Sequence, residues 1–127
     1  MRYSLLLHYP EMFAEDLGAE ALAEGMKAFD DYAKALDAAG VLASAEVLMP
    51  SAATTTISLA TGELVVQDGP LADTKEQLGG TFVVDVTDLD AALAWARQAP
   101  PVRYGHIEIR PTATRFVDGG WTGGPQI

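Results

Sequence analysis

Apolar residues change their spacing along this chain, and each change marks a predicted element. Residues 3–9 form a short apolar run flanked by tyrosines, which predicts a strand ended by Pro10. Across residues 19–39 the larger apolar side chains recur every three or four positions, which predicts a helix with one buried stripe. The stripe consists of Leu22, Met26, Phe29, Ala33 and Leu36. Gly40 follows, where a helix end favours a left-handed residue.

Five later runs are rich in β-branched and apolar residues and predict further strands. They are residues 41–48, 54–59, 63–67, 81–86 and 104–110. Thr61-Gly62 separates the second run from the third, which predicts a hairpin with a two-residue loop. In the last run, Ile107 and Ile109 alternate with His106, Glu108 and Arg110, which therefore face the other side of the sheet.

A second helix is predicted between residue 87 and about residue 98. Thr87 and Asp90 have the spacing of a capping box, with Thr87 as the N-cap. Leu89, Leu93 and Ala96 would form its buried stripe, and the prolines at 100 and 101 end it.

The resulting order is β-α-β, a hairpin, and β-α-β, which predicts an α+β, ferredoxin-like split βαβ fold with an inserted hairpin. Residues 1–111 would form one domain, and residues 112–127 a glycine-rich C-terminal tail. Two helices would cover one face of the sheet and leave the other face open. A second copy of the chain is the simplest cover, so we expect a homodimer with a cleft between the subunits.

Composition narrows the class of protein. The chain has 127 residues, a formal net charge of −10 and a sequence pI of about 4.3, which argues against binding to nucleic acid. It has no cysteine, so disulfides and thiolate chemistry are excluded. No run approaches the roughly 18 apolar residues of a membrane span. We therefore expect a cytoplasmic protein, with neither nucleic acid nor membrane as a partner.

The charged loop between residues 67 and 80 is the first candidate site. Its polar and turn-forming residues could position a small ligand, and they are Asp68, Gly69, Pro70, Asp73, Lys75 and Glu76. The structural alternative is that Asp73 caps a short helical turn, because residues 73–76 also have capping-box spacing. The glycines at 79 and 80 would let the next strand bend or bulge as it begins.

The second candidate site joins His8, Asp85 and His106. If the first and third principal strands run parallel, these three residues meet at one end of the sheet, with Glu108 and Arg110 deeper along the open face. A histidine oriented by a carboxylate can act as a general acid or base, and two histidines with a carboxylate could also hold a divalent metal. The alternative is that both histidines are ordinary hydrogen-bonded interface residues. No metal site and no particular cofactor is assigned.

Three segments also carry a family resemblance. Residues 68–80 (DGPLADTKEQLGG), 88–96 (DLDAALAWA) and 107–111 (IEIRP) together strongly resemble the DGPF-domain branch of the YCII-related proteins. The resemblance implies a dimeric α+β barrel of ferredoxin-like protomers, and the frequent placement of DGPF-type genes beside sigma-factor genes implies a regulatory setting.

This chain departs from the family pattern at three points. Leu71 stands where the motif has phenylalanine, and Asp73 stands where it has glutamate. Residues 11–40 contain no histidine, so the His–Asp pair associated with the first helix of better-studied relatives has no counterpart here.

We therefore expect a homodimeric small-molecule-binding protein with a regulatory or accessory role. The alternatives are a cofactor-independent enzyme that uses His8 or His106 in acid–base chemistry, and a protein-interaction adaptor. The sequence identifies neither the ligand nor the reaction.

Overall fold

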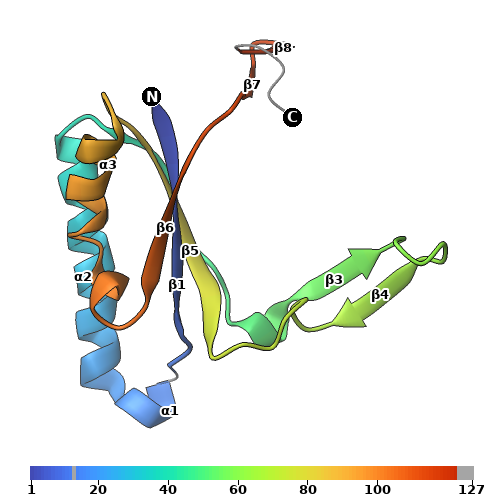
Figure 1. Ribbon diagram of the computed structural model, residues 1–127. Coiled ribbons are helices and arrows are strands. Elements are labelled where there is room, and N and C mark those ends of the chain that lie inside the picture. The colour runs from blue at the N-terminus through green and yellow to red at the C-terminus, as the bar shows by residue number, and fades with distance from the viewer. Residues whose placement is uncertain (13, 123–127) are drawn as a thin grey trace.

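The computed structural model describes residues 1–12 and 14–122. Its centre is a four-stranded sheet in the order β2 (Leu42–Val47), β5 (Glu76–Asp85), β1 (Arg2–Pro10) and β6 (His106–Pro111). All neighbouring strands are antiparallel. Helices α2 (Ala19–Ala38) and α3 (Leu89–Ala96) cover one face of the sheet (Figure 1). The predicted α+β class is confirmed, and within the described residues no helix lies over the other face of the sheet.

The core lies between the sheet and the two helices. Alternation along β1 places Tyr3, Leu5 and Leu7 in it, and Phe82 and Val84 of β5 face the same way. From α2, Tyr32 and Leu36 complete the layer. These apolar side chains pack together, and their burial is the main force that holds the two helices on the sheet.

Tyr32 also joins the two helices directly. Its hydroxyl donates a hydrogen bond of 2.9 Å to the carbonyl oxygen of Trp95 in α3. Its ring lies 5.4 Å from that of Phe82. Burial raises the pKa of Tyr32 to about 12, so the hydroxyl keeps its proton and remains a donor at physiological pH.

A bulge lies where β5 begins, at the pair of glycines. Leu7 pairs with Gly80 but His8 pairs with Leu78, so Gly79 is the extra residue on β5. The ring of Tyr9 covers Gly79, and its hydroxyl donates to the Gly79 carbonyl oxygen at 3.1 Å. The predicted bulge is confirmed, although β5 starts at Glu76 rather than at residue 81.

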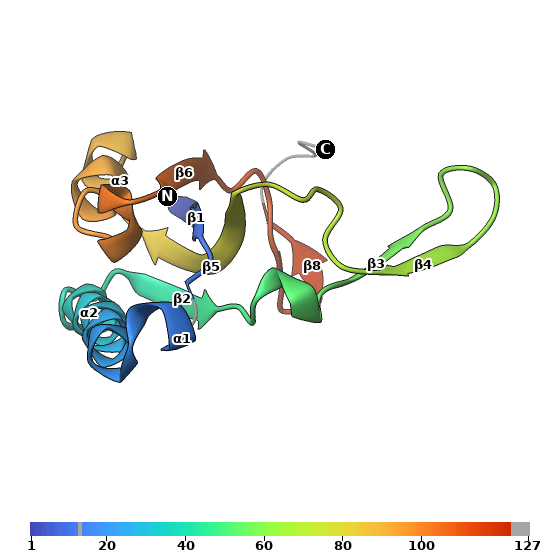
Figure 2. The ribbon, with the colours of Figure 1, turned by 90° about the horizontal axis from the view of Figure 1, so that it is seen from below.

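A two-stranded arm projects from the sheet on the side away from the helices (Figures 1 and 2). It consists of β3 (Thr55–Ser58) and β4 (Val65–Asp68), and a short 3-10 turn, η1 (Ser51–Ala53), leads into it. The hairpin is confirmed, but its loop spans residues 59–64 and is longer than the predicted two residues because Ser58 is the last residue of β3 to pair.

Several local predictions need correction. The N-cap of α3 is Asp88, whose carboxylate accepts a 2.9 Å hydrogen bond from the Ala91 amide, so the assignment of Thr87 was wrong. The buried residues of α3 are Ala92 and Ala96, whereas Leu89 is 50% exposed. Of the three residues predicted for the buried stripe, only Ala96 is buried.

Three short elements were not predicted at all. They are α1 (Ala14–Leu17), the 3-10 helix η2 (Pro100–Arg103), and a small hairpin of β7 (Phe116–Val117) and β8 (Gly120–Trp121). Asp118 and Gly119 form the turn of that hairpin with positive φ angles of 52° and 79°. The predicted glycine-rich tail is thus folded as far as residue 122, and residues 123–127 lie outside the described part of the chain.

Candidate functional site

The two histidines of the chain lie side by side on the open face of the sheet. His8 of β1 is paired directly with His106 of β6, because these strands run antiparallel. Side chains alternate between the two faces of a strand, so His8 faces away from the side of the sheet where Leu7 is buried. His106 and Glu108 likewise face away from the side occupied by Ile107. The sequence therefore placed both histidines correctly at one end of the sheet.

Asp85 does not join them. The first and third principal strands are antiparallel, not parallel as expected, so Asp85 pairs with Arg2 at the far end of the sheet. There its carboxylate lies 3.3 Å from the N-terminal ammonium group of Met1. The expected parallel pairing was wrong, and it placed Asp85 at the wrong end of the strand.

Two glutamates take the place expected for Asp85. Nδ1 of His106 lies 2.8 Å from Oε1 and 3.0 Å from Oε2 of Glu76, the first residue of β5. The pKa of His106 is raised because the Glu76 carboxylate accepts a hydrogen bond from the ring and favours its charged form. Among the described residues, Nε2 of His106 has no hydrogen-bond partner, so this atom is free to meet a ligand.

The second pair joins His8 to Glu108. Nε2 of His8 lies 2.5 Å from Oε1 of Glu108, a close polar contact. This nitrogen is shielded from solvent and makes no well-directed hydrogen bond to a described residue. A buried ring nitrogen without a directed partner is a group that a ligand or a water molecule can satisfy.

These side chains share one shallow hollow of about 490 Å³. It is lined by His8, Thr74, Lys75, Glu76, His106 and Glu108. We call it the histidine hollow. Two imidazoles, two carboxylates and one ammonium group therefore surround a single space, which is large enough for a small polar molecule.

The charged loop borders the same region. A neighbouring hollow of about 540 Å³ is lined by His8, Thr74 and Glu76 together with residues 70–72 of the loop. The two candidate sites, treated separately in the sequence, thus lie next to each other. Glu76 belongs to both, which the sequence did not reveal because its strand was expected to begin five residues later.

The loop is held by other residues than expected. Gln77 Nε2 donates to the carbonyl oxygens of Ala72 and Thr74 at 3.0 and 3.1 Å, and the Thr74 hydroxyl donates to the Glu76 carbonyl oxygen at 2.6 Å. Residues 73–76 form no helical turn, so the capping role considered for Asp73 was wrong.

The remaining predicted site residues lie at the edges of this region. Asp68 ends β4, and Gly69, at φ 99°, donates its amide to the Thr54 carbonyl oxygen at 2.7 Å, which closes the base of the arm. Arg110 pairs with Ser4 on the open face, two positions beyond Glu108, and does not line the histidine hollow.

Within residues 1–12 and 14–122, no group of three or more histidine and acidic side chains is placed to hold a metal ion. No helix in that part of the chain has the length and apolar character required to cross a bilayer.

The fold and the hollow define an α+β domain with an antiparallel sheet and a polar site on its uncovered face. The chain belongs to the YCII-related domain family, whose model matches residues 1–114. It is also 33% identical over 115 residues to an uncharacterized protein of Rhizobium meliloti, a match that spans 89% of this chain and 93% of that protein. The family match extends over the sheet, the arm and the histidine hollow, and neither comparison names an activity.

Proposed function

We propose that this chain is a homodimeric small-molecule-binding protein of the DGPF-domain branch, with a regulatory or accessory role and its ligand in the histidine hollow. The observation that carries the proposal is the convergence of two histidine–glutamate pairs on one hollow of the uncovered sheet face. A cytoplasmic location remains the expectation from the cysteine-free composition.

The arm supports the dimer. Its apolar side chains are open to solvent, with exposed fractions of 66% for Ile57 and 60% for Val66. An isolated two-stranded hairpin is only marginally stable in water, and a row of exposed apolar residues marks an interaction surface. A second copy that lies against the open face would bury this arm and turn the histidine hollow into an enclosed cleft, as in a dimeric α+β barrel.

The ligand would be small and polar. The hollow presents both signs of charge, because Lys75 lines it together with Glu76 and Glu108. Arg110, farther along the same face, could bind an anionic group of a longer ligand. A ligand with hydrogen-bond donors and acceptors fits these groups better than a hydrocarbon.

A cofactor-independent enzyme is the second candidate, and the pair of His106 and Glu76 favours it. The carboxylate holds Nδ1 and fixes the orientation of the ring, which leaves Nε2 available to move a proton. In this arrangement His106 would act as the base, Glu76 as its orienting partner and His8 as a second polar contact.

The dimer is tested by light scattering coupled to size-exclusion chromatography. The wild-type chain should elute with twice the protomer mass, and a double Ile57→Ser, Val66→Ser variant should shift towards the monomer. A folded wild-type monomer would contradict the dimer and would leave the arm open for a different protein, which is the adaptor alternative.

The site is tested by thermal-shift screening of a library of polar metabolites. Compounds that stabilise the wild type should fail to stabilise a His8→Gln, His106→Gln variant but should still stabilise Asp85→Asn, whose side chain lies at the far end of the sheet. Equal stabilisation of all three proteins would refute the site. Conversion of a bound compound that is lost in Glu76→Gln, with binding retained, would establish the enzyme.

A further inference from the structure

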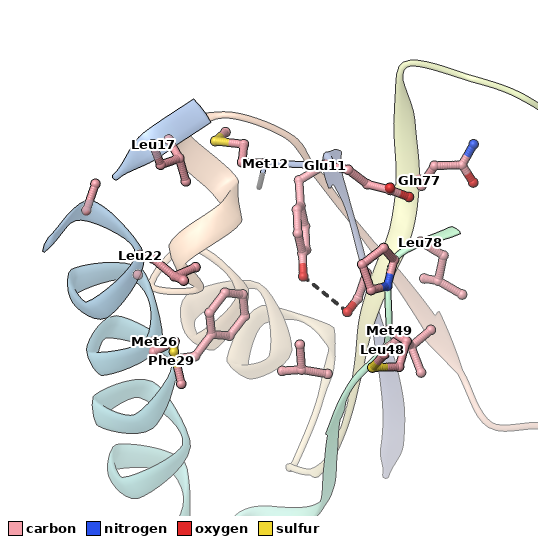
Figure 3. A pocket seen from close by; sticks show the side chains of 16 residues that line it. Glu11, Met12, Leu17, Leu22, Met26, Phe29, Leu48, Met49, Gln77 and Leu78 are labelled. Atoms are coloured by element: carbon pink, nitrogen blue, oxygen red, sulfur yellow. Dashed lines mark hydrogen bonds between the residues drawn. The ribbon is translucent and has the colours of Figure 1, made fainter. Parts of the chain in front are cut away.

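An apolar cavity lies on the helix side of the sheet (Figure 3), and none of its lining residues belongs to the histidine hollow. Its volume is about 320 Å³, and it lies between the first half of α2, the end of β1, the end of β2 and the bulged start of β5. Leu22, Met26 and Phe29 of α2 form one wall, and Leu48, Met49 and Leu78 form the opposite wall.

The first half of α2 explains why a cavity exists here. Leu22 and Met26 belong to the stripe that the sequence assigned to the core, yet they are 36% and 67% exposed. The second half of the same stripe is packed, and Leu36 is fully buried. The apolar face of the helix is therefore continuous, but only its C-terminal half has a sheet partner.

Gly25 keeps the cavity open. It lies inside α2 and lines the cavity, and a Cβ atom added to it would meet no other atom within 4 Å. Glycine is the least favourable residue after proline in a helix interior. Gly25 disfavours the helix although a larger side chain would fit at this position. The space beside it therefore remains available to a ligand.

The polar groups of the cavity already have partners. The Tyr9 hydroxyl donates to the Gly79 carbonyl oxygen (dashed in Figure 3), and Glu11 accepts a 2.8 Å hydrogen bond from the Ser51 amide. Gln77 donates to two carbonyl oxygens of the charged loop. Among the described residues, no lysine, arginine or histidine lines the cavity. An anionic ligand would therefore find one carboxylate and no positive charge.

Methionines gather around the cavity. Met12, Met26 and Met49 line it, whereas Met1 is at the other end of β1. Methionine side chains are flexible and polarizable, and they adapt to apolar ligands of different shapes. The cavity is about twice the size of a ~150 Å³ apolar cavity that accepts benzene.

We infer that this cavity is a binding site for a small, uncharged, predominantly hydrocarbon molecule, separate from the histidine hollow. A single chain forms both walls described above, so the site is present without a second subunit. A ligand there would rest between α2 and the bulge at Gly79, and would complete the packing of the helix's first half.

Nuclear magnetic resonance of the methionine methyl groups tests this directly. With 1-octanol as the probe, the signals of Met12, Met26 and Met49 should shift in a saturable way while that of Met1 stays in place. Octanoate at neutral pH has the same chain length with a negative charge, and it should bind at least tenfold more weakly.

Matched variants locate the probe. Gly25→Leu adds a side chain to the cavity wall and should weaken 1-octanol binding at least tenfold. Ala23→Leu makes a similar apolar addition to an exposed position of α2 that does not line the cavity, and should bind 1-octanol as the wild type does. Met26→Gln, at a second exposed wall position, should also weaken binding.

Three outcomes would overturn the inference. The first is an equal shift of the Met1 signal, and the second is unchanged 1-octanol binding by both Gly25→Leu and Met26→Gln. The third is that the methionine signals depend on protein concentration and that 1-octanol dissociates a dimer. This third result would show that a second copy of the chain fills the cavity. Retained 1-octanol binding in the His8→Gln, His106→Gln variant would separate this site from the one in the histidine hollow.

Discussion

Gly79→Ala should destabilise the protein through Tyr9. A Cβ atom at position 79 would lie 2.5 Å from the Tyr9 hydroxyl oxygen and 2.6 Å from its Cε1 atom, distances that real side chains do not tolerate. The ring must therefore swing away from the bulge. It would lose its hydrogen bond to the Gly79 carbonyl oxygen and its packing against Phe29 and Tyr104, whose ring centres lie 6.2 and 6.0 Å away.

The size of the effect follows from these contacts. The hydrogen bond contributes about 1 kcal/mol. Each of the two aromatic pairs contributes about 1 kcal/mol. Alanine offsets roughly 0.5–1 kcal/mol of this loss in unfolding free energy, because it lowers the conformational entropy of the unfolded chain relative to glycine. The free energy of unfolding should fall by about 2 kcal/mol, which lowers Tm by roughly 8 °C for a domain of this size.

Urea unfolding followed by circular dichroism, at one fixed protein concentration, measures this change. Gly25→Ala is the matched control, because it makes the same substitution where the added atom meets nothing, and it should raise the free energy of unfolding by about 0.5–1 kcal/mol. In a Tyr9→Ala background, Gly79→Ala should be nearly neutral. The reasoning is refuted if Gly79→Ala is as stable as the wild type, or if its penalty persists without the Tyr9 ring.

Three further predictions concern the sheet end and α3. Gly105→Ala would place a Cβ atom against the main chain of β1, which can yield less than a side chain, so unfolding in urea should show a loss of at least about 2 kcal/mol. Asp88→Ala removes the N-cap of α3 and should lower stability by about 1 kcal/mol, whereas Thr87→Ala should stay within about 0.5 kcal/mol. The pKa of His106 is raised by Glu76, so the stabilisation from this pair is complete below pH ~6.5 and is lost as pH rises through the folded-state value. A titration of the His106 ring by nuclear magnetic resonance should show that pKa fall in Glu76→Gln, and an unchanged value would contradict the assignment.

The architecture was predictable because its signals are local. The alternation of His106, Glu108 and Arg110 with the two isoleucines gave the correct face of β6, and the paired glycines gave the bulge. The class of fold followed from the order of these elements. The position of Asp85 was wrong because the third principal strand lies between the two strands of the split βαβ unit and runs antiparallel to both, so the expected parallel pairing conflicted with the predicted topology.

The composition of the histidine hollow was only half predictable. The alternation of side chains predicted that the two histidines share one face. The partner of His106 is Glu76, however, and the sequence pattern assigned Glu76 to a loop. The start of β5 at Glu76 depends on pairing with Pro10, and that pairing is visible only in the folded sheet. A polar residue just before a predicted strand carries no marker that the strand will extend to include it.

The apolar cavity could not be predicted from the hydrophobic pattern, for a different reason. A helical stripe predicts which residues share a face, but it does not predict whether anything lies opposite that face. Leu22 and Met26 are on the correct face and still have no core partner. The one sign of the cavity in the sequence was Gly25, a residue unfavourable in a helix that lies beside the stripe. It can be interpreted only once the structure shows that the space next to it is empty.

The two sites are linked through a single dipeptide of β1. His8 points to the open face and lines the histidine hollow, while Tyr9 points to the helix face and lines the apolar cavity. Both residues lie at the bulge, where Gly79 lets Tyr9 rest on the strand and shifts the register by one position beside His8. A change in the cavity that moves the Tyr9 ring therefore acts on the same backbone that positions His8. The bulge is the point where the register of β1 and β5 shifts, so both sites are built against the same irregular stretch of backbone.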